Sequence, residues 1–113
     1  MTIASAPVWE DKRTEETRRV EDFLRNAGFQ QADAYRYHLA SIRVRVIDPR
    51  FEGLSNEKRD AIVEPFLDQL PEETQQDIIS LYSFAPSELM LNKKPTREFM
   101  LNMEFDEPSP SML

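Results

Sequence analysis

The feature that most constrains this chain is the strict alternation of side chains in the segment Ser41–Asp48. Aliphatic residues and arginines take alternate positions, with Ile42, Val44 and Val46 set against Arg43 and Arg45. Because successive strand residues point to opposite faces, this alternation predicts a β-strand with one buried face and one solvent-exposed face. The preceding segment alternates as well, with Tyr35 and Tyr37 set against Arg36 and His38. We therefore expect an antiparallel hairpin that ends at Pro49.

Helical patterns flank this hairpin. A helix is expected over 14–27, where Thr14 is a candidate N-cap, apolar residues follow at helical spacing and Gly28 marks the end. A second helix should follow Ser55, with Pro65 kinking or splitting it near 61–65 and a fresh helical turn at Pro71. Strand-forming residues over 77–84 predict a third strand, and 86–91 a last short helix. The expected fold is α+β, a small three-stranded sheet with helices on one face, in the order α-β-β-α-β-α.

The chain divides into three segments. Residues 1–13 are expected to form a flexible arm with Trp9 as its hydrophobic anchor, and residues 14–91 a single α+β domain. Residues 92–113 form an acidic tail that contains Met, Pro and Ser. Apolar residues alternate in this tail at Phe99, Leu101, Met103 and Phe105, which predicts a strand-like segment. This segment is expected to dock on its own domain or to add to the sheet edge of another chain.

Composition excludes several kinds of functional site. The chain has no cysteine, two glycines and one histidine. These counts exclude disulfides, thiolate metal sites, the HExxH motif and glycine-rich phosphate loops. The acids Glu72, Glu73 and Asp77 suit the start of a helix, where the helix dipole favours negative charge. We therefore expect a protein that is not an enzyme, holds no metal at His38 and needs no cofactor.

Charge is unevenly distributed along the chain. The net charge is −7, yet residues 1–63 hold 11 basic and 11 acidic residues, and residues 64–113 hold three basic and ten acidic residues. The arginines of the neutral part either form local ion pairs or make a small basic surface for an anionic partner. No apolar run suggests a signal peptide or a membrane span, so a cytoplasmic protein without membrane partners is expected.

Several motifs occur in a characteristic order between Thr14 and Leu89. They are Phe51-Glu-Gly53, Arg59 six residues later, the pair Ile62-Val63, then Leu67 and Leu70, the segment Ile78–Phe84, and Pro86-Ser-Glu88. In this order the chain resembles the BolA family of small α+β proteins. The stretch 41–53, the turn at 70–73 and the Pro-Ser-Pro-Ser end also resemble a narrower set of small bacterial proteins of uncharacterised function.

The BolA resemblance implies a class II KH-like sheet and a non-enzymatic partner role. BolA proteins pair with monothiol glutaredoxins around an iron–sulfur cluster, and some are proposed to bind DNA. On this basis the residues expected to bind a partner are Phe51, Gly53, Arg59, Asp60 and Asp77. Two of them depart from the family, because Asp77 and Asp60 stand where it has histidines. A carboxylate is a poor substitute for imidazole on such a cluster, so we expect cluster sharing to be lost.

Three functions remain open from the sequence. The first is a non-catalytic, BolA-like interaction or regulatory module with a protein partner. The second is a weak nucleic-acid-binding KH-like domain that uses Arg43, Arg45 and Arg59, although the chain lacks the GXXG loop of KH domains. The third is a self-associating protein, a monomer or weak homo-oligomer, that assembles through its tail segment.

Overall fold

Three strands form one mixed sheet. The structure is a computed structural model, and it describes residues 8–89 and 97–109. The predicted hairpin consists of β1 (Gln31–His38) and β2 (Ser41–Ile47), which pair antiparallel. β3 (Ile78–Phe84) pairs parallel with β2, so the order across the sheet is β1-β2-β3. The prediction of an α+β fold built on a three-stranded sheet is confirmed.

The first helix forms where its capping residues predicted it. α1 (Glu15–Asn26) begins with a capping box, in which Thr14 and Thr17 each accept a hydrogen bond from the other's backbone N–H. Gly28 follows the helix with a φ of 108°, a left-handed conformation that suits glycine. Before α1 lies a short 3-10 helix, η1 (Val8–Lys12), which includes the expected anchor residue Trp9.

The helical segments between β2 and β3 follow the predicted order with two differences. After the 3-10 turn η2 (Pro49–Phe51) comes α2 (Asn56–Leu67), which contains Pro65 and is not split by it. The proline sits near the end of α2, so its missing donor affects only the last turn. α3 (Glu72–Asp77) is the fresh turn expected after α2, and it takes in the residue predicted to start the third strand. A 3-10 helix, η3 (Pro86–Leu89), follows β3.

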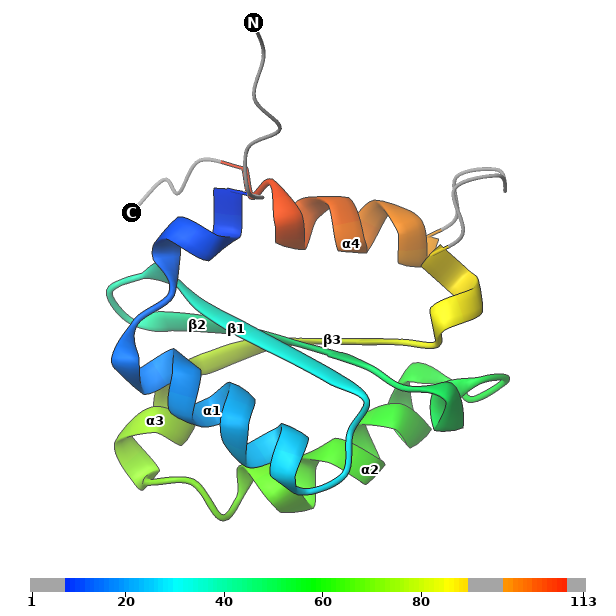
Figure 1. Ribbon diagram of the computed structural model, residues 1–113, viewed down its shortest axis with the longest axis horizontal. Helices are drawn as coiled ribbons and strands as arrows, with labels where there is room; N and C mark the ends of the chain where they lie inside the picture. Colours follow the sequence, from blue (N-terminus) through cyan, green and yellow to red (C-terminus); the bar gives the residue numbers. More distant parts are fainter. Residues whose placement is uncertain (1–7, 90–96, 110–113) are drawn as a thin grey trace, which may run out of the picture.

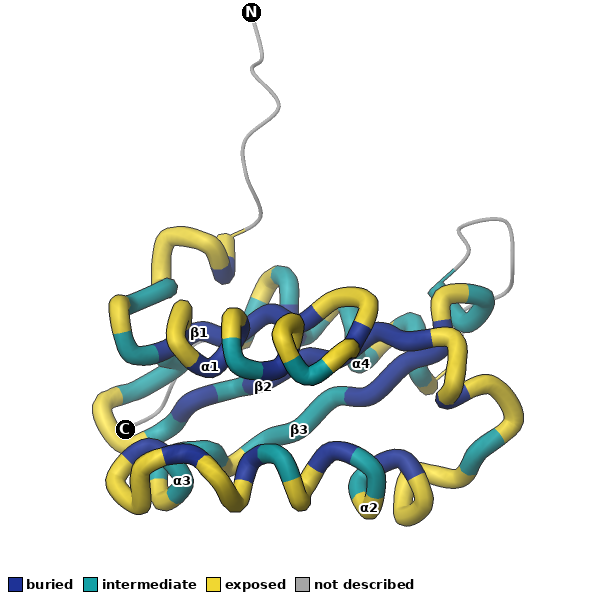
Figure 2. The backbone as a smooth tube through the Cα atoms, turned by 60° about the horizontal axis from the view of Figure 1, so that its bottom comes forward, coloured by how far each residue is buried: buried dark blue, intermediate teal, exposed yellow. Residues whose placement is uncertain are grey.

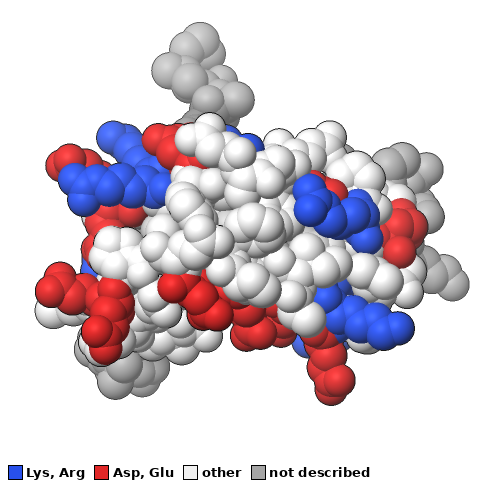
Figure 3. All heavy atoms as spheres, turned by 90° about the horizontal axis from the view of Figure 1, so that it is seen from below, with Lys and Arg blue, Asp and Glu red and all other residues white. Residues whose placement is uncertain are grey.

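Helices cover both faces of the sheet (Figure 1). α1, α2 and α3 lie on one face, whereas η1 and a last helix, α4 (Arg97–Asp106), lie on the other. The expectation of helices on one face therefore holds for the first three helices and is wrong for α4. Seen from the α1–α3 side, uncharged atoms occupy the centre and charged side chains surround them (Figure 3). Within the described residues no helix combines the length and apolarity needed to cross a membrane.

The main core lies between the sheet and α1–α3. Buried residues follow the strands and the inward turns of the helices (Figure 2). The aliphatic face of β2 is fully buried here, as its alternation predicted, together with Val20 and Leu24 of α1 and Val63 of α2. Burial of such side chains stabilises the fold by about 1.5–3 kcal/mol each.

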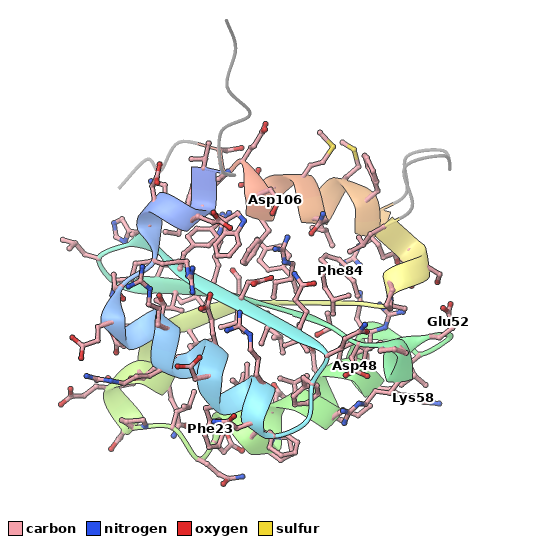
Figure 4. All side chains as sticks on the ribbon, viewed as in Figure 1. Phe23, Asp48, Glu52, Lys58, Phe84 and Asp106 are labelled. Atoms are coloured by element: carbon pink, nitrogen blue, oxygen red, sulfur yellow. The ribbon has the colours of Figure 1, made fainter. Side chains whose placement is uncertain are left out.

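A second core lies on the opposite face of the sheet, beneath α4 and η1. Trp9, Tyr35 and Phe105 are its buried members, and the rings of Tyr35 and Phe105 meet edge to face with centroids 4.8 Å apart. Because this cluster joins η1, β1 and α4, it holds two segments far apart in sequence against one face of the sheet. Asp106 of α4 and Phe84 of β3 lie on this same side (Figure 4).

The arginine face of β2 is not solvent-exposed, which corrects the prediction of a wet face. Arg45 is 5% exposed and lies under α4, with guanidinium nitrogens 2.8 Å from an Asp33 oxygen and 2.7 Å from an Asp106 oxygen. Arg43 donates to Glu104 of α4 at 3.0 Å. The alternation identified the two faces correctly, but the acidic helix that covers the second face comes from a distant part of the chain.

The tail prediction of a strand-like segment is also wrong. Phe99, Leu101, Met103 and Phe105 lie in helix α4, and they do not share one face. Phe105 is fully buried, whereas Met103 is 49% exposed. Apolar residues at every second position also include pairs four residues apart, such as Leu101 and Phe105, and such pairs share one face of a helix. The inward positions recur at three- and four-residue spacing, through Leu101, Asn102 and Phe105.

Candidate interaction groove along the outer edge of β3

β3 lies at one edge of the sheet. Its inner side pairs with β2, and no other strand of the described residues pairs with its outer side. An unpaired strand edge presents backbone N–H and C=O groups that can accept a further strand. The edge of β3 is therefore the first place to look for a binding site.

The hydrogen bonds at the end of β3 show which residues face outward. The carbonyl of Phe84 accepts from the N–H of Asp48, so the backbone groups of Phe84 point toward β2. The carbonyl of Ser83 instead accepts from Arg59 of α2 at 2.8 Å. Since both backbone groups of a strand residue point to the same side and successive residues alternate, the N–H and C=O of Leu81 point outward.

A bulge near the start of β3 leaves an aliphatic side chain exposed beside this edge. The register with β2 runs from Ile42–Ile78 directly to Arg43–Ser80, so Ile79 has no counterpart in β2. The side chain of Ile79 is 66% exposed, which is unusual for a large aliphatic residue. Bulges re-aim side chains at sheet edges, and here the bulge leaves one aliphatic side chain in solvent.

The outer edge of β3 forms the floor of a groove of about 540 Å³. One wall is a stripe of α2, and the other belongs to the first residues of α4. We call this the β3 groove, and define it by residues 78–84 with Asn56, Asp60, Glu64, Leu67, Arg97, Glu98 and Leu101. The α2 residues recur every three or four positions, so they share one face of the helix.

The α2 wall of the β3 groove is acidic. Asp60 and Glu64 are four residues apart on one helix face, and no ion pair within the described residues involves either of them. Burial, and then the negative charge of Glu64, raise the pKa of Asp60 above its usual value of 3.8. Within residues 8–89 and 97–109, no cation pairs with either of these two neighbouring carboxylates that line the groove, although each would be stabilised by one.

The five residues predicted to bind a partner do not share one surface. Phe51 is fully buried in the main core, and Arg59 is 3% exposed. Gly53 lies in an exposed turn with a φ of 74°. Asp77 ends α3, directly before β3. Asp60 alone among the five lines the β3 groove.

The three arginines predicted to contact nucleic acid are held by carboxylates. Arg43 and Arg45 lie beneath α4 in the ion pairs described above. Arg59 places a guanidinium nitrogen 2.7 Å from an oxygen of Glu88. A phosphate could reach these groups only by displacing α4 or Glu88.

The remaining candidates have local partners. Arg36 bridges α1 and α3, with one guanidinium nitrogen 2.6 Å from Glu16 and 2.7 Å from Asp77. His38 ends β1, and its Nδ1 accepts a long bond of 3.4 Å from the N–H of Ala40. Within residues 8–89 and 97–109, no group of three metal-ligating side chains is placed to hold a metal ion.

Sequence reasoning missed most of the groove. Glu64, Ile79, Leu81 and Glu98 were not singled out, and Leu101 was chosen for a strand that does not form. One signal was present, because Asp60 and Glu64 have the four-residue spacing of a single helix face. That α2 and α4 flank the same strand edge follows only from the tertiary arrangement.

Comparison with protein-family models, curated proteins and solved structures gave no significant match.

Proposed function

We propose that this chain is a non-catalytic protein-interaction module that binds an extended segment of a partner protein along the β3 groove. The observation that carries the proposal is the outer edge of β3, which pairs with no strand of the described residues, with the backbone groups of Leu81 directed into a groove walled by two helices. An extended peptide can continue the sheet there as a fourth strand, with main-chain hydrogen bonds supplying affinity and the walls supplying selectivity.

The charge on the groove favours a different protein over a second copy of this chain as the occupant. A symmetric dimer that pairs β3 with β3 antiparallel keeps each helix layer on its own side of the sheet. The α2 walls of the two copies would then meet, with Asp60 and Glu64 of one facing the same acids of the other. Like charges at such distances oppose association, and the net charge of −7 adds to this.

The resemblance to the BolA family supports a partner-binding role, because that is the role it implies. The position that matches one family histidine, Asp60, lines the groove. The carboxylates of Asp60 and Asp77 favour an interaction without a shared iron–sulfur cluster, since hard oxygen donors suit such clusters poorly. If the partner is a monothiol glutaredoxin, we expect a colourless complex after iron–sulfur reconstitution.

A pair of variants at one position tests the proposal. Leu81→Pro removes the outward N–H, a change that edge strands tolerate, and Leu81→Ala removes a similar amount of packing but keeps the N–H. Random seven-residue peptides are selected by display on the wild-type protein, and the affinities of the selected peptides are measured for both variants. Circular dichroism verifies that both variants fold.

We expect the selected peptides to bind Leu81→Ala about as well as the wild type and Leu81→Pro about fivefold more weakly, the effect of one lost hydrogen bond. Equal binding to Leu81→Pro and Leu81→Ala would contradict binding at the β3 edge. A doubled mass in light scattering that Leu81→Pro alone reverts to monomer would show instead that a second copy occupies the groove.

A further inference from the structure

The spacing of the two acids on the α2 wall of the β3 groove matches the two-residue repeat of an extended chain. Four residues along a helix advance about 6 Å, which separates Asp60 from Glu64 along the groove. Two residues along a strand advance about 6.6–6.8 Å, so side chains at i and i+2 on one face of a strand have nearly the same separation. A strand lying along β3 can therefore place two successive same-face side chains opposite the two carboxylates.

The two walls differ in chemistry. The α2 wall presents Asp60 and Glu64, which have no cationic partner in the described part of the chain, whereas the α4 wall presents Leu101 with the opposite charges of Arg97 and Glu98 side by side. Side chains of an added strand alternate between the walls, because successive strand residues point to opposite faces of a sheet. The arrangement thus demands cations at alternate positions and favours apolar side chains between them.

Resting on the proposed function, we propose that the partner segment is cationic in a specific pattern: two lysines or arginines at i and i+2 that pair with Asp60 and Glu64, with an apolar residue between them facing Leu101. The pattern supplies a cation to each of two carboxylates that no described residue pairs with, and it puts no like charge against either wall. It also uses the attraction between the acidic chain and a basic partner.

The electrostatics of Asp60 agree with this assignment. The other charged or titratable side chains that line the groove are Glu64 on α2, Tyr82 on β3, and Arg97 and Glu98 on α4. Among them Glu64 raises the pKa of Asp60, and burial raises it further. Residues that serve binding commonly carry a charge that is directed into a groove and that lowers the stability of the folded protein.

Four capped heptapeptides test the pattern. The first is Ser-Val-Lys-Val-Lys-Val-Ser, and the second has the same composition with adjacent lysines, Ser-Val-Lys-Lys-Val-Val-Ser. The third and fourth replace both lysines of the first by glutamine or by glutamate. Each is titrated into the full 113-residue chain, and the backbone amide signals of residues 78–84 are followed by NMR at low and moderate salt.

We expect the first peptide to bind most tightly and to shift the amide of Leu81. The double variant Asp60→Asn with Glu64→Gln should weaken its binding about five- to thirtyfold, and added salt should weaken it as well. The matched control Glu57→Gln neutralises an exposed acid of α2 that does not line the groove, and it should leave the affinity unchanged.

The outcomes separate the two proposals. If the glutamine, glutamate or adjacent-lysine peptide shifts Leu81 with the same affinity as the first, the cationic pattern is wrong while edge binding stands. Equal losses for the double variant and for Glu57→Gln would also overturn the pattern, since the attraction would then be general. If none of the four peptides shifts Leu81, the proposed function itself fails.

Discussion

Asp60 illustrates at the level of one residue how a binding role and stability can oppose each other. Its pKa is raised, so the folded protein holds the ionised carboxyl at a cost relative to the unfolded chain. We therefore predict that Asp60→Asn raises the melting temperature at neutral pH by about 2 °C while weakening binding of a cationic peptide. Differential scanning calorimetry gives the first quantity and peptide titration the second.

The control for Asp60 is Glu57→Gln, in the first turn of α2, where the helix dipole favours an acid. This change should give no gain in melting temperature and no loss of binding. A lower melting temperature for Asp60→Asn than for the wild type would contradict the account of Asp60.

Arg45 shows the opposite case, a charged residue that the fold requires. We predict that Arg45→Met destabilises the protein by about 3–5 kcal/mol, because it removes the two hydrogen bonds that Arg45 donates to buried Asp33 and leaves Asp33 only the longer ion pair with Arg25 at 3.7 Å. Urea unfolding measures this loss. The exposed pair of Arg19 with Glu15 provides the comparison, since Arg19→Met should change stability by less than about 1 kcal/mol. Similar losses for the two arginines would show that the ion pair beneath α4 contributes little.

At the level of elements, the tail residues that are buried against the sheet distinguish a helix from a strand. In a strand Met103 and Phe105 would share a face, whereas in a helix they point apart. We predict a loss of about 3–5 kcal/mol for Phe105→Ala and less than about 0.5 kcal/mol for Met103→Ala. Comparable losses in urea unfolding would support the strand instead.

The elements themselves could largely be predicted from the sequence, because their signals are local. The alternation of β2 and the cap at Thr14 act within a few residues. The burial of Arg45 beneath α4 could not be predicted, since it depends on an ion pair with Asp106, which lies 61 positions further along the chain. The β3 groove had one local signal, the spacing of Asp60 and Glu64, and its other wall arises only when α4 packs on the sheet.

At the level of the whole molecule, ion pairs that join helices to the sheet should make the fold sensitive to acid. The hydrogen bond from Arg36, and then that from Thr74, lower the pKa of Glu16 below its usual value of 4.5. A carboxyl whose pKa is lowered by folding stabilises the protein above 4.5, and that contribution is lost as the pH falls through the lowered value. Asp60 has the opposite sign and offsets part of this loss.

We accordingly predict that Glu16→Gln lowers stability at neutral pH and reduces the further loss on acidification. Urea unfolding of the wild type and the variant across the acidic range gives both curves. Parallel curves would show that Glu16 does not contribute to the acid sensitivity, and Glu15→Gln, an exposed neighbour on α1, serves as the control.

The measurement that tests the central claim most directly is hydrogen exchange at the amide of Leu81, followed by NMR with and without the Ser-Val-Lys-Val-Lys-Val-Ser peptide. The structure predicts fast exchange without peptide, because this N–H points away from β2, and strong protection at saturation. The amide of Tyr82, which points toward β2, should be protected in both states. Slow exchange of Leu81 without peptide, or unchanged exchange at saturation, would contradict strand addition along β3.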